Sequence, residues 1–127
     1  MPRMNNTILR SNFEYKFSLL IFYARTFGIS FITTSFLRTA EEQNKRFKEG
    51  KSLCDGYKKI SKHQLGRARD IVIIDSEGNP IWEHTPEYDR LGQLWEQMGG
   101  VWGGRWYKEG KTSFDDIYHF EDGETEG

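Results

Sequence analysis

The chain has 127 residues, the length of a single domain, and 36% of them are hydrophobic and 15% aromatic. A chain of this size can bury a substantial core, so we expect one globular domain over residues 1–127. The aromatic content excludes a disordered protein, and the single cysteine, Cys54, excludes an internal disulfide framework. The apolar run at residues 17–24 is too short to span a bilayer, which predicts no membrane insertion.

The net charge is -1, but the basic and acidic residues are unevenly distributed. Residues 1–70 contain 14 basic and 6 acidic side chains, whereas residues 71–127 contain 4 and 13. The basic excess at residues 45–69 could attract an anionic polymer, either nucleic acid or cell wall. The simpler interpretation, which we favour, is a solvated basic face that pairs with the acidic half. Because no recognised nucleic-acid motif accompanies the charge, no nucleic-acid partner is predicted.

The beginning of the chain predicts a helix followed by a strand. Residues 1–11 are polar and are expected to form a loose tail. From Phe13 to Phe27 the apolar residues recur at helical spacing, and Gly28 is a natural end for the helix. Residues 29–36 are rich in β-branched and aromatic side chains, which is typical of a strand.

A second helix is expected directly after this strand. Thr39 and Glu42 have the spacing of a capping box, in which a hydroxyl and a carboxylate satisfy backbone N–H groups at the helix start. The helix should run to about Glu49, and residues 51–62, which have no clear period, should form a loop. Arg38 then lies where strand meets helix, a position that suits a functional side chain.

The next part of the chain predicts two strands and a third helix. Residues 69–75 indicate a strand, which is followed by a turn and a short strand ending at Trp82. Thr85 and Pro86 are expected to start a helix as its cap and first residue. The apolar residues then recur at helical spacing up to Met98.

The last part of the chain predicts a loop, a strand and a tail. Residues 101–106 are rich in Gly and Trp and indicate a loop that could wall a cleft, with Trp102 and Trp106 contacting a substrate. Residues 117–121 alternate as a strand does, and residues 122–127 form an acidic and loose tail. The element order argues for an α+β fold with a small antiparallel sheet and flanking helices in a single domain.

Two histidines and an aspartate supply the donors of a zinc site. His63 and Asp70 lie seven residues apart, and His119 follows near the C-terminus. A catalytic zinc site takes three protein ligands and keeps one position for water. Asp116 could then transfer protons, and Arg38 could stabilise an oxyanion. Spacing alone leaves a structural role for His119 open, because a lone histidine on a strand is more often a hydrogen-bonded core residue.

Five sequence blocks occur in an order that a known peptidase family shares. They are Arg38-Thr39-x-Glu41-Glu42-Gln43, Gly50-x-Ser52, Ser61-x-His63-x-x-Gly66-x-Ala68-x-Asp70, Trp102-Gly103-Gly104-x-Trp106 and Asp116-x-x-His119-Phe120-Glu121. With these blocks the chain resembles the zinc D-Ala-D-Ala carboxypeptidase / L-alanyl-D-glutamate peptidase family, in particular its short phage endolysin members. The similarity extends from the first helix to Glu121.

The resemblance implies a role for each residue of the site. It makes His63, Asp70 and His119 the ligands of a Zn²⁺ ion, and it makes Asp116 the catalytic base. Arg38 matches an arginine that steadies the substrate and the developing oxyanion. The single domain is accordingly expected to be a zinc peptidase domain.

Some positions are less clear or depart from the family pattern. For Ser61 two interpretations are equally good. Its hydroxyl either orients the site or contacts the substrate, or it only closes a turn. The family often has an acidic residue in place of Arg105 and a proline in place of Tyr118. Residues 116 and 119 would face opposite sides of a strand, so the chain must bend near Asp116 for both side chains to reach one metal.

The resemblance predicts a monomeric enzyme that cleaves peptidoglycan stem peptides. We prefer an L-alanyl-D-glutamate endopeptidase, because the chain is minimal and lacks an evident signal peptide. A D-Ala-D-Ala carboxypeptidase or dipeptidase is the alternative, and a non-catalytic wall-binding zinc module is an alternative of another class. Such an endolysin is expected to be made in the cytoplasm and to act at the bacterial cell wall.

Overall fold

The computed structural model describes residues 5–124, which form four helices and a five-stranded antiparallel sheet. In chain order the elements are α1 (Asn6–Thr26), β1 (Ser30–Ser35), α2 (Ala40–Lys48), β2 (Ala68–Ile74), β3 (Pro80–Ile81), α3 (Pro86–Gln97), β4 (Gly100–Trp102), α4 (Gly103–Lys108) and β5 (His119–Asp122). This arrangement confirms the expected α+β class. No helix within residues 5–124 combines the length and apolarity needed to cross a membrane.

Strand β2 is the centre of the sheet, whose order is β1-β2-β5-β4, and β3 pairs with the end of β2. Across β1 and β2, Ser35 lies opposite Asp70, next to an irregularity in the register. Across β2 and β5, Asp70 lies opposite His119. Side chains of directly opposed residues are close neighbours, so the register alone brings two of the predicted zinc ligands together.

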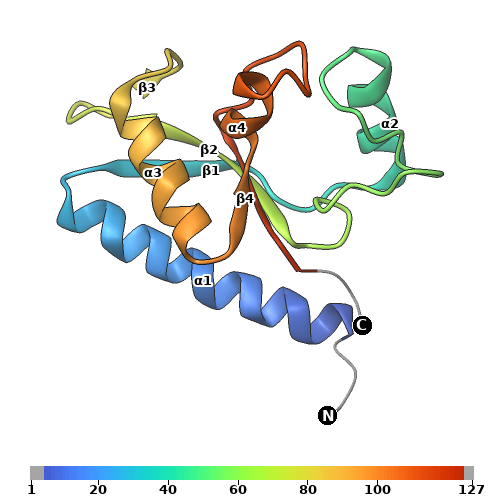
Figure 1. The fold of residues 1–127 in the computed structure, drawn as a ribbon, viewed down its shortest axis with the longest axis horizontal. Coiled ribbons are helices and arrows are strands. Elements are labelled where there is room, and N and C mark those ends of the chain that lie inside the picture. Colours follow the sequence, from blue (N-terminus) through green and yellow to red (C-terminus); the bar gives the residue numbers. More distant parts are fainter. Residues whose placement is uncertain (1–4, 125–127) are drawn as a thin grey trace.

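Helix α1 lies along the sheet, below it in Figure 1, and supplies much of the core. Its buried side chains recur at helical spacing, as expected from the sequence: Leu9, Phe13, Phe17, Leu20 and Ala24. The helix begins earlier than predicted, because the Asn5 side chain accepts a hydrogen bond from the Ile8 N–H at 3.0 Å. The expectation of a loose tail is therefore wrong from Asn6 onward, and residues 1–4 lie outside the described part. Gly28, at φ +75°, ends the helix as predicted.

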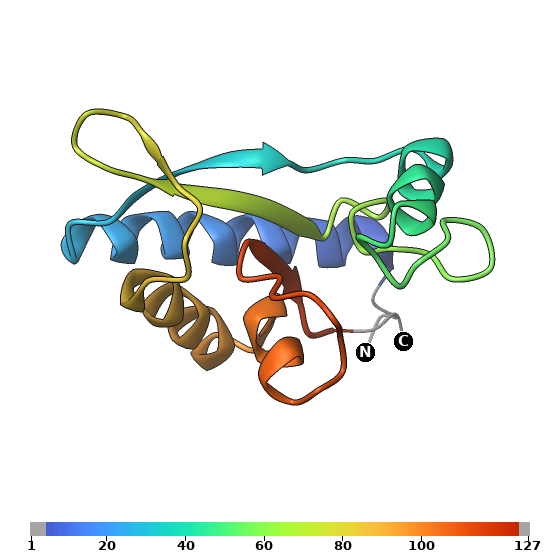
Figure 2. The same ribbon diagram turned by 90° about the horizontal axis from the view of Figure 1, so that it is seen from above.

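Helix α2 stands beyond the end of β1, apart from the other helices (Figure 2). Its capping box is present: the Glu42 N–H donates to Thr39 Oγ1 at 3.1 Å, and the Thr39 N–H donates to Glu42 Oε1 at 3.0 Å. These bonds fix where the helix starts relative to the strand. The helix consequently lies next to the end of the sheet that carries Asp70.

The glycine-rich segment at residues 101–106 is not a loop, because its residues belong to β4 and α4. Trp102 is 1% exposed and donates its indole N–H to the Ile117 carbonyl at 2.9 Å. Its ring fits because α3 carries Gly92, where a Cβ would lie 2.2 Å from the ring. The position of Trp102 depends on packing against Gly92, which lies 10 residues earlier in the chain. The local composition of residues 101–106 could therefore not predict it.

Thr85 precedes α3 as predicted, but its hydroxyl makes no cap hydrogen bond.

The acidic C-terminal segment is not a loose tail at its start. Asp122 belongs to β5 and is 3% exposed. Its carboxylate accepts hydrogen bonds from Arg67 Nε at 2.7 Å and from Lys62 Nζ at 2.6 Å. The predicted tail is therefore wrong at Asp122, because two cations from the loop before β2 hold it. Residues 125–127 lie outside the described part.

Replacing Asp122 should strongly destabilise the protein. In Asp122→Ala the buried guanidinium of Arg67 loses the Asp122 carboxylate, and breaking a buried ion pair costs about 3 kcal/mol or more. Urea denaturation at fixed zinc concentration would measure the free energy of unfolding. The control is Glu49→Ala, which removes only the exposed pair between Glu49 and Lys51 and should change stability by less than about 1 kcal/mol. Equal effects of the two substitutions would contradict this account.

Candidate metal centre

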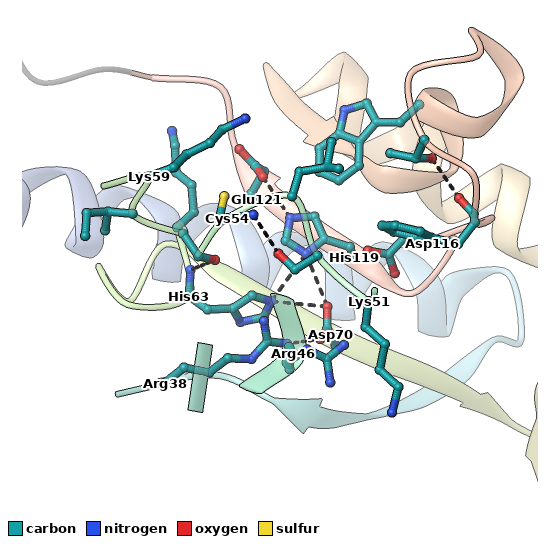
Figure 3. Close-up of a pocket in the computed structure, with 18 of the residues that line it drawn as sticks. Arg38, Arg46, Lys51, Cys54, Lys59, His63, Asp70, Asp116, His119 and Glu121 are labelled. Carbon is teal, nitrogen blue, oxygen red and sulfur yellow. Dashed lines mark hydrogen bonds and ion pairs between the residues drawn. The ribbon is translucent and has the colours of Figure 1, made fainter. Parts of the chain in front are cut away.

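Three donor atoms converge at one end of the sheet (Figure 3). His63 Nε2 lies 3.2 Å from Asp70 Oδ1 and 3.3 Å from His119 Nδ1, and His119 Nδ1 lies 3.2 Å from Asp70 Oδ1. Ligands placed tetrahedrally at the usual zinc bond lengths are separated by roughly 3.3 Å. The triangle of His63, Asp70 and His119 therefore fits three corners of a zinc tetrahedron, and the metal that this donor set suits is zinc.

The sequence around His63 forms a tight turn that ends just before β2. The His63 N–H donates to Ser61 Oγ at 3.2 Å, and the Arg67 N–H donates to the Lys62 carbonyl at 2.9 Å. Gly66 closes the turn at φ +71°, where a Cβ would also lie 2.7 Å from Arg10 Nε. The glycine thus allows the chain to reverse between the first two ligands.

The second ring nitrogen of each histidine lies within hydrogen-bond distance of a fixed acceptor. His63 Nδ1 lies 2.9 Å from the Phe36 carbonyl, and His119 Nε2 lies 2.8 Å from Glu121 Oε1. With the protons on these nitrogens, the remaining lone pairs of both rings point at the site, which is how outer partners orient metal ligands. Glu121 had no role in the sequence interpretation. The sequence did contain an indication of this contact, because Glu121 follows His119 by two residues and residues two apart on a strand share a face.

Arg38 holds the other oxygen of the Asp70 carboxylate. Its Nη2 donates to Asp70 Oδ2 at 2.5 Å, its Nε donates to Ser35 Oγ at 3.1 Å, and its Nη1 donates to Gln43 Oε1 at 3.1 Å. Buried Gln43 in turn donates to Ser52 Oγ at 2.8 Å. Arg38 is therefore a positioning residue for a metal ligand, and Gln43 and Ser52 extend this support to the loop after α2.

The site has the electrostatics of a cation-binding centre. Burial lowers the pKa of His63, which keeps this ring neutral. Although burial opposes its ionisation, the hydrogen-bond contact with the His119 ring, together with the contact with His63, holds the pKa of Asp70 far below its usual range. Burial also opposes the charged form of His119, but Asp70 and Glu121 raise the pKa of this ring to about 10. The surrounding carboxylates thus favour a positive charge at this point, either a proton or a metal ion.

Asp116 reaches the same pocket from a turn before β5. Residues 117–118 form the turn, and the His119 N–H donates to the Asp116 carbonyl at 3.2 Å. The expected bend is therefore present. Gly103 permits it, because a Cβ there would lie 2.3 Å from the Asp116 carbonyl oxygen. Burial, with a contribution from the charge of Asp70, raises the pKa of the Asp116 carboxyl.

The pocket in front of the three donors has a volume of about 370 Å³. Ser61 and Trp106 line it, and the Trp106 ring lies 5.1 Å from the His119 ring. Trp102 does not line it, so its predicted contact with substrate is not supported by its position. Six cationic side chains also line the pocket: Arg38, Arg46, Lys51, Lys59, Lys62 and Lys111. Of these six, the sequence placed only Arg38 at the site; Arg46, Lys51, Lys59 and Lys62 belong to the basic excess at residues 45–69, which the sequence did not connect with the site.

The two departures from the family pattern leave the donors unchanged. Arg105 forms an ion pair with Glu96 at 2.8 Å and does not line the pocket. The Tyr118 hydroxyl donates to the Trp82 carbonyl, and its ring lines a second cavity of about 260 Å³. Arg46, Asp70 and Asp116 line both cavities.

Residues 55–122 match the model of a family described as D-alanyl-D-alanine carboxypeptidase. This segment contains all three donors, Asp116 and Glu121, and it covers more than half of the chain. No curated protein sequence matches the chain significantly.

Several solved structures share the fold. The L-Ala D-Glu endopeptidase ChiX of Serratia marcescens has a TM-score of 0.67 and 21% identity, over 87% of this chain and 77% of ChiX. A variant of the vancomycin-resistance D,D-pentapeptidase VanY in complex with Zn(II) has a TM-score of 0.65 and 19% identity, over 89% and 71%. VanYB in complex with D-alanine-D-alanine has a TM-score of 0.59 and 20% identity, over 89% and 70%.

Glu121→Gln should weaken zinc binding by roughly 10–100-fold without unfolding the protein. The substitution leaves an acceptor for His119 Nε2 but removes the negative charge that makes the ring a better ligand. Competition with a chromophoric chelator would measure the zinc affinity. Glu77→Gln, in the exposed turn before β3, is the matched control and should bind zinc as the unmodified protein does. Unchanged affinity in Glu121→Gln would remove Glu121 from the metal centre.

Zinc affinity should rise about tenfold for each pH unit between roughly pH 7 and 9. The raised pKa of His119 means that this ring still carries a proton in the metal-free protein over this range, so zinc must displace one proton. Asp70 and His63 are already deprotonated, because their pKa values are lowered. Calorimetry in buffers of different ionisation enthalpy would count the released proton. An affinity that does not change with pH would contradict the assignment.

Proposed function

Because the chain belongs to the D-alanyl-D-alanine carboxypeptidase family of zinc metallopeptidases, we propose that it is an endopeptidase that cleaves peptidoglycan stem peptides between L-alanine and D-glutamate. One observation carries the proposal: Asp116 lines the same pocket as the three donors His63, Asp70 and His119. A wall-binding module without activity would need the metal donors at most. A buried carboxyl with a raised pKa beside them is what hydrolysis requires.

The roles of the residues follow from their positions. Zinc bound by the three donors would polarise the scissile carbonyl and make water more acidic. Asp116 accepts the proton of the attacking water and passes it to the leaving amine, and its raised pKa suits transfer in both directions. Arg38 keeps Asp70 oriented and ionised, and its positive charge favours the developing oxyanion. Ser61 and Trp106 line the walls that the substrate would touch.

The second cavity supports the preference for an endopeptidase. It shares Arg46, Asp70 and Asp116 with the first cavity and continues toward Trp82 and Tyr118. An endopeptidase needs space for the peptide on both sides of the scissile bond, and the second cavity offers such a space beside Asp116. The similarity of the fold to the L-Ala D-Glu endopeptidase ChiX agrees with this preference.

A D-Ala-D-Ala carboxypeptidase is the second candidate. It is favoured by the description of the family and by the fold of VanYB, whose structure holds D-alanine-D-alanine. In both cases the enzyme would act on the cell wall of a bacterium, as an endolysin does. The two activities release different products, so one experiment separates them.

The experiment is digestion of purified peptidoglycan by the zinc-loaded protein, with identification of the released peptides by mass spectrometry. A new amino terminus on D-glutamate is the expected result, and it should disappear when a chelator removes the zinc. Release of free D-alanine would favour the carboxypeptidase instead. If the zinc-loaded protein cleaves no bond in any wall type, both enzymatic functions are wrong.

Asp116→Asn should bind zinc normally but lose turnover by roughly 10²–10⁴-fold, because only the proton-transfer group is removed. Asp115→Asn is the matched control, since this neighbouring carboxylate pairs with His84 at 2.7 Å and does not line the pocket. Initial rates of peptide release, compared at equal zinc occupancy, would measure the effect. Full activity in Asp116→Asn would show that another group transfers the proton.

A further inference from the structure

Arg46 is a cationic side chain at the wall of the pocket. It lies on α2 and lines both cavities. Its Nε is enclosed by protein and has no hydrogen-bond acceptor, and no ion pair joins it to any side chain within residues 5–124. The charge of Arg46 is thus unpaired among these residues, and its position at the wall of both cavities favours an anionic ligand.

The other arginine at this wall is already engaged. Arg38 directs Nε, Nη1 and Nη2 at Ser35, Gln43 and Asp70. Arg46 lies close enough to Arg38 for the two positive charges to affect each other, and close enough to Asp116 for opposite charges to attract. Figure 3 shows both arginines among the residues around the pocket. Arg46 is therefore the guanidinium at this wall that remains available to a substrate next to the proton-transfer group.

We propose that Arg46 binds the free α-carboxylate of the D-amino acid on the leaving side of the scissile bond. This inference rests on the proposed function. In stem peptides D-glutamate continues the chain through its γ-carboxyl, so its α-carboxylate is free and lies next to the bond that follows L-alanine. The α-carboxylate of a terminal D-alanine occupies the same chemical position. The substrate class is thus a peptide whose leaving residue carries this carboxylate, and the α-amide found in D-isoglutamine is disfavoured.

The chemistry of the side chain supports a carboxylate rather than a neutral group. The two terminal Nη groups of a guanidinium present donors in a fixed fork that matches two carboxylate oxygens. An amide in the same place would offer one oxygen and turn its NH₂ group toward a cation. A site built to bind one polar group rejects an analogue that lacks it, because a buried donor is then left unpaired. Lys51 and Lys111 line the same pocket but are exposed and lie 3.9 and 3.6 Å from Glu49 and Glu109.

The test compares two peptides and four forms of the zinc-loaded protein. The peptides carry either D-glutamate or D-isoglutamine after L-alanine and are otherwise identical. The forms are the unmodified protein, Arg46→Met, Arg46→Lys and the control Lys48→Met, which changes an exposed cation on the same helix. We expect the unmodified protein and the control to prefer the carboxylate peptide by roughly 10²-fold in kcat/KM, mainly through KM. Arg46→Met should lose this preference, and Arg46→Lys should keep part of it.

Two results would overturn the proposal: a preference that persists in Arg46→Met, or no preference in the unmodified protein. Equilibrium binding measurements test the role of Arg46 independently of whether the protein cleaves the L-alanyl-D-glutamate bond. Calorimetry uses γ-D-glutamyl-L-lysine and the analogue in which the α-carboxyl of D-glutamate is an amide, neither of which contains the L-alanyl-D-glutamate bond. The carboxylate form should bind more tightly, and Arg46→Met should abolish this difference. If the protein releases D-alanine instead, the same comparison uses peptides that end in D-alanine and D-alaninamide. If no form of the protein distinguishes the carboxylate from the amide, whether or not it shows turnover, Arg46 does not take part in substrate recognition.

Discussion

The Asp70 carboxylate is the point on which the rest of the structure depends. One oxygen faces both histidine donors, and the other accepts the short hydrogen bond from Arg38. Through the first oxygen, the β2–β5 register and the turn before β2 become parts of one metal centre. Through the second, the start of α2 is tied to the sheet, and Gln43 carries this support to the loop beyond the helix. Because a buried carboxylate needs partners on both oxygens, three distant segments of the chain are held in one arrangement.

Charge is organised in two layers around this point. Close to the donors, Asp70, Asp116 and Glu121 favour a cation. Farther out, the walls are basic, which suits an anionic peptide. The basic excess at residues 45–69 has accordingly two fates. Lys62 and Arg67 pair with Asp122 from the acidic half, as the simpler interpretation expected. Arg46, Lys51 and Lys59 line the pocket, and Lys62 does so as well.

Local patterns predicted those elements whose structure depends on neighbours in sequence. The helical spacing in α1, the end of this helix at Gly28 and the capping box of α2 are interactions within one or two turns, and all are present. The predictions failed where distant contacts decide the structure. Trp102 is in the core because Gly92 makes room for its ring, and Asp122 is ordered because cations far away in sequence bind it. Composition marked these segments as loop and tail because it carries no information on such partners.

The sequence by itself pointed to the three candidate donors, the candidate base and the family, because ligand chemistry and motif order are properties of the chain. It also determined that Asp116 and His119 need a bend between them. Only the tertiary structure decided which atoms of these residues meet, that Glu121 orients His119, and that Arg38 holds a ligand. It alone showed that Arg46 lines the same pocket as Asp116 and forms no ion pair with another residue of the described part of the chain. The physical reason is that hydrogen-bond geometry and burial depend on distances between segments far apart in sequence, which spacing along the chain does not contain.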